Sequence, residues 1–226
     1  MFDSKYGKFL TVLLIVVIIA IIGLLGYLGY DYYEKYFISK DTAEFVDSFA
    51  SENENKTNET PNNNTSTGDV DSNILDQIQS TEQTNSGGTT KKRKTYKGFN
   101  VVGTIEIPKT KLKYPILETV TKKSIETAVA VMYGPGPNKV GNTTIMGHNY
   151  RNGLFFSNNK KLEVGDKIYI TDLDGKKLTY TIYNKYETTP EDAEYMTRNT
   201  KGATEISLST CTDDSKARLI IWAKAD

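Results

Sequence analysis

An uncharged stretch of 22 residues near the N-terminus, from Phe9 to Tyr30, most constrains how this chain can fold. A helix of that length rises about 33 Å, enough to cross a hydrocarbon core of about 30 Å. Lysines precede it, at Lys5 and Lys8, and an acid, Asp31, follows it. The positive-inside tendency therefore predicts a transmembrane helix over residues 9–30, with residues 1–8 in the cytoplasm and the remainder outside the cell. A cleaved signal peptide is the alternative, which the length of the apolar run disfavours.

Residues 31–97 are expected to form a polar, acidic and disordered tether. Between residues 41 and 90 there are ten acidic residues and one basic residue, Lys56. Such a composition cannot bury enough apolar surface to offset the entropy of ordering the chain. Within this segment Thr42–Ala50 could form a short amphipathic helix, and the basic cluster Lys91–Lys94 is expected to be a solvated charge run.

From about Gly98 the sequence changes to short strands separated by turns. The expected strands are Val101–Ile107, Leu112–Leu117, Thr143–Gly147, Lys167–Thr171, Leu178–Tyr186, Thr204–Thr210 and Ala217–Ala223. Apolar residues at helical spacing predict a helix over Ser124–Tyr133, and Asp174-Gly175 predicts a hairpin. Residues 98–226 should therefore fold on their own as a mainly β domain. A small closed or nearly closed β-barrel with one or two short helices is favoured, and an open sandwich is the alternative.

Charge and residue counts exclude several kinds of site in this domain. Residues 98–226 hold 18 basic and 15 acidic residues, too small an excess to indicate nucleic-acid binding. The chain has one cysteine, Cys211, and one histidine, His148. An intramolecular disulfide is impossible, and a zinc site built from cysteine and histidine is close to excluded.

The last two predicted strands bring the cysteine beside an arginine. Alternate residues of a strand share a face. The apolar, core-facing positions are Ile206 and Leu208 on the first strand and Leu219, Ile221 and Ala223 on the second. If the two strands pair with these faces aligned, Cys211 and Arg218 lie together on the other face, directly opposite or offset by two residues.

This pairing suggests a cysteine nucleophile with two supporting groups. A guanidinium favours the thiolate form of a neighbouring thiol and can donate hydrogen bonds to an oxyanion. His148 ends an apolar strand and begins a polar loop, a common position for a catalytic acid or base. Each residue alone is more often structural than catalytic, since a lone cysteine is usually a small buried hydrophobe.

The residues around them resemble the sortase family of cysteine transpeptidases. The strings that carry the resemblance are Ser207-Leu208-Ser209-Thr210-Cys211 with Arg218 after it, Ile145-Met146-Gly147-His148, Leu162-x-x-Gly165-Asp166-x-Ile168, Gly103-Thr104-Ile105-x-Ile107-Pro108, Tyr114-Pro115-Ile116 and Phe155-Phe156. They span about residues 100–226. The order of membrane anchor, polar tether and outer domain also fits that family.

The resemblance implies a closed eight-stranded β-barrel and a reaction. Sortases cleave a C-terminal sorting signal of the Leu-Pro-x-Thr-Gly type, hold an acyl-enzyme at cysteine, and pass it to an amine of a cell-wall precursor or a pilin. It implies that Cys211 is the nucleophile, His148 the general acid and base, and Arg218 the oxyanion or substrate group. Thr210 and Ser209 are expected to support substrate or oxyanion beside the cysteine. The partners implied are surface proteins that bear a sorting signal, at a Gram-positive cell surface.

The subclass stays open within this resemblance. The sequence shows no Asp-Pro-aromatic lid segment before the barrel and no second span after Asp226, which favours wall anchoring over pilus polymerisation. Gly-His-Asn is similar to the subgroup called class B, but Tyr186–Thr204 is too short for the long helix found there. No cofactor or metal is expected. A calcium site is conceivable among the acids Glu187, Glu191, Asp192 and Glu194, although a solvated loop is favoured.

Two other classes of protein compete with this interpretation. The first is another cell-wall cysteine enzyme. An L,D-transpeptidase usually carries a glycine before its cysteine, where this chain has Thr210, and a cell-wall peptidase usually places its cysteine at a helix N-terminus. The second is a membrane-tethered binding barrel without catalysis. The exact sorting motif, the amine acceptor, the oligomeric state and the protonation states of Cys211 and His148 do not follow from the sequence.

Overall fold

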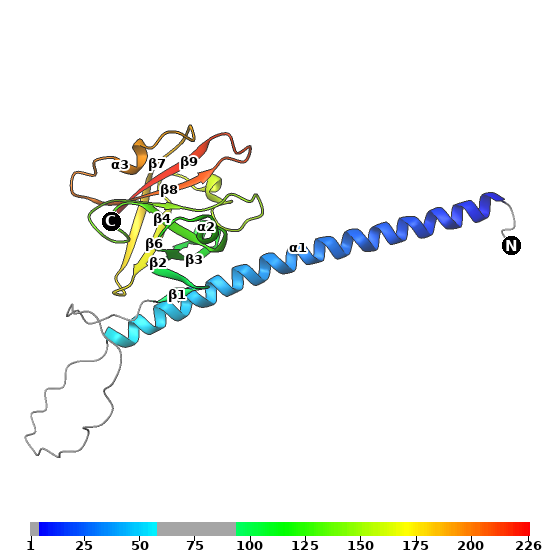
Figure 1. The fold of residues 1–226 in the computed structure, drawn as a ribbon, viewed down its shortest axis with the longest axis horizontal. Coiled ribbons are helices and arrows are strands. Elements are labelled where there is room, and N and C mark those ends of the chain that lie inside the picture. Colours follow the sequence, from blue (N-terminus) through cyan, green and yellow to red (C-terminus); the bar gives the residue numbers. More distant parts are fainter. Residues whose placement is uncertain (1–4, 58–93) are drawn as a thin grey trace, which may run out of the picture.

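The computed structural model describes residues 5–57 and 94–226, which form one long helix and a β-barrel that packs against it (Figure 1). The helix, α1, covers Lys5–Thr57. The other helical elements are α2 (Lys122–Thr127), α3 (Glu194–Thr197) and two 3₁₀ turns, η1 (Pro108–Thr110) and η2 (Asn159–Lys161).

A single sheet closes into the barrel. Its strands are β1 (Thr95–Tyr96), β2 (Phe99–Ile107), β3 (Leu112–Leu117), β4 (Val129–Tyr133), β5 (Gly141–Met146), β6 (Lys167–Asp172), β7 (Lys177–Thr188), β8 (Thr204–Cys211) and β9 (Arg218–Ala225). Their spatial order is β1-β2-β3-β4-β5-β8-β9-β7-β6, and β2 also pairs with β6. Because β1 is a two-residue strand at the side of β2, the other eight form the closed barrel. The expected eight-stranded barrel is confirmed, and the open sandwich is excluded.

The expected helix over Ser124–Tyr133 is wrong in its second half. α2 starts from Thr121, whose hydroxyl caps the backbone N–H of Ser124, and it ends at Thr127. Strand β4 then begins at Val129, where Ala128, Val129 and Ala130 are all fully buried. A continuous apolar run buried on both faces fits an inner strand, whose pairing with β3 and β5 overrides the apparent helical spacing.

The predicted hairpin at Asp174-Gly175 joins β6 and β7. The side chain of Asp172 accepts hydrogen bonds from the backbone N–H groups of Asp174 and Lys176, at 3.0 Å each. Gly175 takes a positive φ of 82°, a conformation that glycine adopts without steric cost. The turn sets the register in which Ile170 faces Leu178.

The barrel interior is filled by inward-facing side chains from all the long strands. Those with no exposed surface are Ile105, Ile107, Ile116, Ile145, Ile168, Ile170, Tyr180, Ile182, Ile206, Leu208 and Ile221, together with Leu162. This packed interior fixes the strand registers, because a slip of one residue would turn each strand's apolar side chains outward.

The helix α1 differs from the expected order of a short span followed by a tether. Its N-terminal part is long and apolar enough to cross a membrane, with a mean hydropathy of 3.2 over its most apolar window and none of that window buried. The helix then continues past residue 31, the expected start of the tether, as far as Thr57. Residues 58–93 of the predicted tether lie outside the described residues, whereas its last four residues, 94–97, are described.

The C-terminal part of α1 packs on the barrel, which explains why the helix continues. Val46 and Phe49 are each only 1% exposed, and they belong with Phe45 to one face of the helix. The amphipathic segment Thr42–Ala50 noted in the sequence is thus part of a longer helix. The barrel domain also begins slightly earlier than residue 98, since β1 starts at Thr95.

Candidate active site

Cys211 and Arg218 face each other across the antiparallel pair β8–β9. They are direct partners in the register, and Nη1 of Arg218 donates a hydrogen bond to Sγ of Cys211 at 3.1 Å. Both residues are half-buried. The prediction that the two lie on the same face is confirmed, in the directly opposed register.

The apolar face of the same two strands sets this register. Leu208 faces Ile221 and Ile206 faces Ala223, and all four side chains are fully buried in the barrel interior. The pairing continues without a bulge to the end of β8. The cysteine and arginine are therefore positioned by the packing of the core.

His148 reaches the same end of the barrel through the neighbouring strand β5. Strands β5 and β8 are parallel, with Met146 opposite Ser209, and the N–H of Gly147 donates to the carbonyl of Ser209 at 3.2 Å. His148 and Cys211 are each the second residue beyond that aligned pair. The two strands consequently deliver His148 and Cys211 to one edge of the sheet.

Gly147 is required by the packing beneath this edge. A Cβ at this position would lie 2.9 Å from Cδ2 of Phe156 and 2.9 Å from Cγ1 of Val129. The glycine lets the strand end approach the aromatic ring closely. This gives a steric reason for the Gly-His pair that the sequence contains.

Aromatic rings surround the imidazole of His148. The ring of Tyr150 lies 4.7 Å away at an interplanar angle of 30°, and the ring of Phe155 meets it edge-on at 6.4 Å. Burial lowers the pKa of His148 below its ordinary value of 6.5, while the charge of Glu126 acts in the opposite direction. A lowered pKa favours the neutral imidazole near pH 7, the form that accepts a proton.

Asn149 links the histidine loop to the cysteine strand, a contact that the sequence reasoning missed. Its Nδ2 donates to the carbonyl of Cys211 at 3.0 Å and to Oδ1 of Asp213 at 2.9 Å. Lys160 also binds Asp213, at 2.5 Å, and these hydrogen bonds hold the pKa of that carboxyl below its usual range. Asn149 follows His148 in the sequence, but only the fold shows that its side chain contacts the backbone of Cys211, the residue opposite Arg218.

Thr210 and Ser209, the predicted supporting residues, have different surroundings. Thr210 is 2% exposed, and its hydroxyl has no hydrogen-bond partner among the described residues. It lines a cavity of about 140 Å³ together with Cys211, Asn149 and Leu219. The hydroxyl of Ser209 is fully buried and lies 3.2 Å from the hydroxyl of Tyr195. Thr210 therefore lines the same cavity as Cys211, whereas the hydroxyl of Ser209 is engaged with that of Tyr195.

Comparison with known proteins shows to which family this barrel belongs. The sortase domain family matches residues 105–226, more than half of the chain. The chain belongs to the sortase family. It is 32% identical over 124 residues to sortase A of Bacillus anthracis, a match that covers 54% of this chain and 58% of that protein. The chain thus matches less than two thirds of the length of this curated relative.

Solved sortase structures share the fold. A sortase D5 transpeptidase of Clostridium perfringens has a TM-score of 0.52 and 31% identity, with 56% of this chain and 79% of that chain covered. A lid mutant of sortase A from Corynebacterium diphtheriae has a TM-score of 0.52 and 26% identity, covering 57% and 71% of the two chains. These neighbours come from different sortase classes, so the subclass of this sortase stays open.

The segment between β7 and β8 covers the outer face of this sortase beside the site. Arg198 attaches this segment to strands β5, β7 and β8. Its guanidinium forms an ion pair with Glu205 and donates to Oδ1 of Asn142 at 3.0 Å and to the hydroxyl of Tyr183 at 2.8 Å. The guanidinium carbon also lies 4.6 Å from the ring of Trp222. Sequence reasoning left Arg198 out, because its partners come from strands far apart in the chain.

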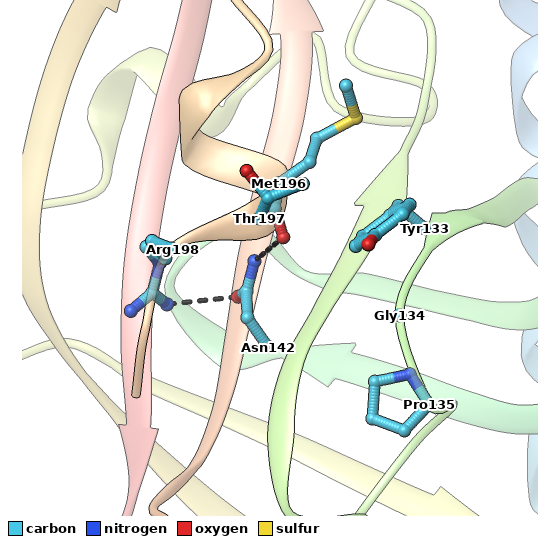
Figure 2. A pocket seen from close by; sticks show the side chains of 7 residues that line it. All are labelled: Tyr133, Gly134, Pro135, Asn142, Met196, Thr197 and Arg198. Carbon is cyan, nitrogen blue, oxygen red and sulfur yellow. Dashed lines mark hydrogen bonds between the residues drawn. The ribbon is translucent and has the colours of Figure 1, made fainter. Parts of the chain in front are cut away.

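Arg198 also borders a cavity of about 460 Å³ (Figure 2). Figure 2 shows Asn142 in the middle, bonded on one side to Arg198 and on the other to the carbonyl of Met196, with Tyr133 across the cavity. The bond from Asn142 to Met196 measures 2.9 Å. The connection between β7 and β8 is therefore held against β5 by polar contacts at both ends of one asparagine side chain.

The four acids considered for calcium do not assemble into a site. Asp192 accepts hydrogen bonds from the hydroxyl of Thr188 at 2.6 Å and from the backbone N–H of Glu194 at 2.8 Å. Over residues 5–57 and 94–226 no group of three or more histidine, cysteine or acidic side chains is arranged to hold a metal ion. These acids act locally in the described structure, where Asp192 shapes the turn before α3.

Proposed function

We propose that this sortase is a cysteine transpeptidase that cleaves a Leu-Pro-x-Thr-Gly-like sorting signal through a thioester at Cys211. The observation that carries the proposal is the 3.1 Å contact between Arg218 Nη1 and Cys211 Sγ, at the barrel edge to which β5 also brings His148. Membership of the sortase family supports it. The family match also weighs against the L,D-transpeptidase and peptidase alternatives.

In the acylation step the proton of the Cys211 thiol passes to the neutral ring of His148, and the resulting thiolate attacks the threonine carbonyl carbon of the sorting signal. A carbon–sulfur bond forms, and the carbonyl oxygen becomes an oxyanion that Arg218 can stabilise with its planar fork of N–H donors. The carbon–nitrogen bond to glycine then breaks, and His148 delivers a proton to the leaving amine. The products are a thioester on Cys211 and the released C-terminal fragment.

In the transfer step an amine attacks the thioester carbonyl. His148, now neutral, takes a proton from the incoming amine, and the carbon–sulfur bond breaks to return the thiolate. The lowered pKa of His148 supports this role, because the neutral ring is the acceptor the step needs. Thr210 lines the cavity that Cys211 also lines, which supports a contact between this residue and the acyl group.

The proposed setting is the outer face of the membrane. The apolar part of α1 anchors the chain with residues 1–8 in the cytoplasm, and lysines before the span with acids after it support that orientation. The substrates are surface proteins that carry a sorting signal. The acceptor is an amine of a peptidoglycan precursor, with a pilin amine as the alternative.

A cleavage and transfer assay tests the proposal. The full chain in detergent is incubated with a set of Leu-Pro-x-Thr-Gly-like peptides, with and without an added amine such as a short glycine peptide. We expect cleavage after threonine, an amide product that contains the added amine, and loss of both in Cys211→Ala. A barrel that binds such peptides but cleaves none of them would instead support the non-catalytic binding alternative.

A further inference from the structure

The C-terminal part of α1 is built into the barrel domain. Thr42, Val46 and Phe49 are each 1% exposed, and they lie one turn apart along one face of the helix. The ring of Phe45 meets the ring of Tyr96 edge-on at 5.0 Å, and α1 contacts β3 along the same face. Burial of these apolar side chains supplies the main stabilisation of the contact.

Charge complementarity fixes the register of this contact. Acids on the helix meet bases on the barrel: Asp47 pairs with Lys113 at 2.6 Å, and Glu52 pairs with Lys94 at 2.8 Å. Asp41 accepts a hydrogen bond from the hydroxyl of Tyr96 and pairs with Lys97, each at 2.7 Å. Exposed pairs of this kind contribute little energy individually, but several in a row allow only one alignment of helix and barrel.

The docked segment is continuous with the apolar segment. α1 runs without interruption from Lys5 to Thr57, so the same helix that is apolar over residues 9–30 contacts the barrel from Ile38 onward. Only about 12 Å of helix separates Tyr30 from Ile38 at the usual rise per residue. A barrel docked on such a helix has a fixed height and a fixed orientation relative to the membrane.

The active-site end of the barrel points along α1, toward the N-terminus of that helix (Figure 1). Figure 1 shows the loop that follows β5 and the loop that joins β8 to β9 at this end of the barrel. The hairpin between β6 and β7 lies at the opposite end, near the C-terminal end of α1 (Figure 1). The loops that carry His148 and follow Cys211 therefore face the half of the helix that is apolar.

We propose that the docked segment Ile38–Glu52 of α1 holds the barrel with its His148 and Cys211 end turned toward the membrane surface. This rests on the proposed membrane anchoring. This orientation brings the site close to any substrate that is held at the same membrane surface. Holding enzyme and substrate at one surface raises their effective concentration without any new contact.

Energy transfer from the protein to the lipid headgroups tests this orientation directly. The full chain is reconstituted in vesicles that contain an acceptor dye on the headgroups, and its single cysteine, Cys211, is labelled with a donor. The matched control carries the donor at the opposite end, as Lys176→Cys in a Cys211→Ser background. The two ends of a small domain lie about 30 Å apart, so we expect at least about twofold more efficient transfer from Cys211.

A second variant separates the docked helix from the membrane without disturbing the barrel. A flexible Gly-Ser linker of about twelve residues inserted between Phe37 and Ile38 leaves the docking face intact. The difference between the two donor positions should then disappear. Cleavage of a soluble peptide should stay within about twofold of the uninterrupted chain, while cleavage of a membrane-anchored peptide should fall several-fold.

The outcomes distinguish the orientation from the anchoring. A chain that does not float with the vesicles in a density gradient would overturn the anchoring and the orientation together. A chain that floats, but transfers energy equally well from Cys211 and from position 176, would overturn the orientation alone. The orientation would also be overturned if the linker changed neither the transfer nor the preference for membrane-held peptide.

Discussion

Arg218 occupies a position in which its charge and its geometry can be tested separately. It lies directly across from Cys211 and donates one N–H to the sulfur, which leaves its other donors available to a substrate oxygen. Lysine would keep the charge but present a compact point donor on a flexible stem. The contact between Cys211 and Arg218 is therefore where the proposed mechanism depends most on the geometry of a single side chain.

Arg218→Lys should slow acylation by a factor on the order of 10²–10³, the usual effect of removing one oxyanion donor. Binding of uncleaved peptide should change much less, because the lost interaction forms mainly in the transition state. Pre-steady-state acylation of Arg218→Lys and Arg218→Ala, measured against the unmodified chain, gives the comparison. A lysine variant that acylates within about threefold of the original would leave arginine only an electrostatic role.

His148 should titrate below its ordinary pKa of 6.5, because its ring is partly buried against Tyr150 and Phe155. As it is the only histidine, its imidazole protons report the titration by NMR without assignment. Glu126→Gln should lower the midpoint further, since the glutamate charge favours the protonated ring. A midpoint at or above 6.5 in the unmodified chain would contradict the burial of the ring.

The same shift has a consequence for stability with a definite sign. Because the pKa is lower in the folded state, the unfolded state binds more protons between the folded value and 6.5. The contribution of His148 to stability is therefore fully present above pH 6.5 and is lost as the pH falls through the folded pKa. Denaturation of the unmodified chain and of His148→Gln over this pH range should differ in slope in that direction.

At the scale of elements, alternation along single strands was predictable and long-range pairing was not. The two-residue period of β8 and β9 was enough to place Cys211 and Arg218 on one face, and the structure selects the directly opposed register, in which Leu208 faces Ile221. The position of His148 depends on the parallel pairing of β5 with β8, two strands separated by about sixty residues. No local pattern encodes that pairing, and only the family resemblance connected the histidine with the cysteine.

Helix α1 shows that composition alone does not decide whether a polar segment is ordered. The acidic, polar stretch after residue 31 indicated a disordered tether, but one face of it holds Phe45, Val46 and Phe49. Three well-placed side chains can order a polar helix when a partner surface exists, and that surface is formed by β1 and β3, which the sequence does not place together. The predicted helix over Ser124–Tyr133 was wrong for the opposite reason. Part of this segment is strand β4, because its buried residues pair with β3.

Phe49→Ala should lower the free energy of unfolding of the helix and barrel by about 1.5–3 kcal/mol, the transfer free energy of a fully buried side chain. Phe37→Ala is the matched control on the same helix, because that ring is 59% exposed. It should change stability by less than about 0.5 kcal/mol. Denaturation followed by the fluorescence of Trp222, the only tryptophan, measures both. Equal stability of the two variants would show that the docked helix contributes nothing to the fold.

At the scale of the whole molecule, a continuous helix and a closed barrel form one assembly around the proposed reaction. The helix combines an apolar segment fit to span a membrane with a docking face, and the barrel brings its cysteine, arginine and histidine strands to one end. The family match covers the barrel from residue 105, whereas the docking helix lies before it. The chemistry is thus expected to follow the family, while the placement of the barrel at the membrane is a property of this chain's own N-terminal helix.

The central claim is that Cys211 carries the acyl group, and intact-protein mass spectrometry tests it most directly. The full chain is mixed with a sorting peptide, quenched in acid within the first turnover, and digested to locate any adduct. We predict an added mass equal to that of the peptide fragment that ends in threonine less one water, attached to Cys211, removed by hydroxylamine and absent in Cys211→Ala. Cleaved peptide without an adduct on the unmodified chain, or cleavage that persists in Cys211→Ala, would contradict the account.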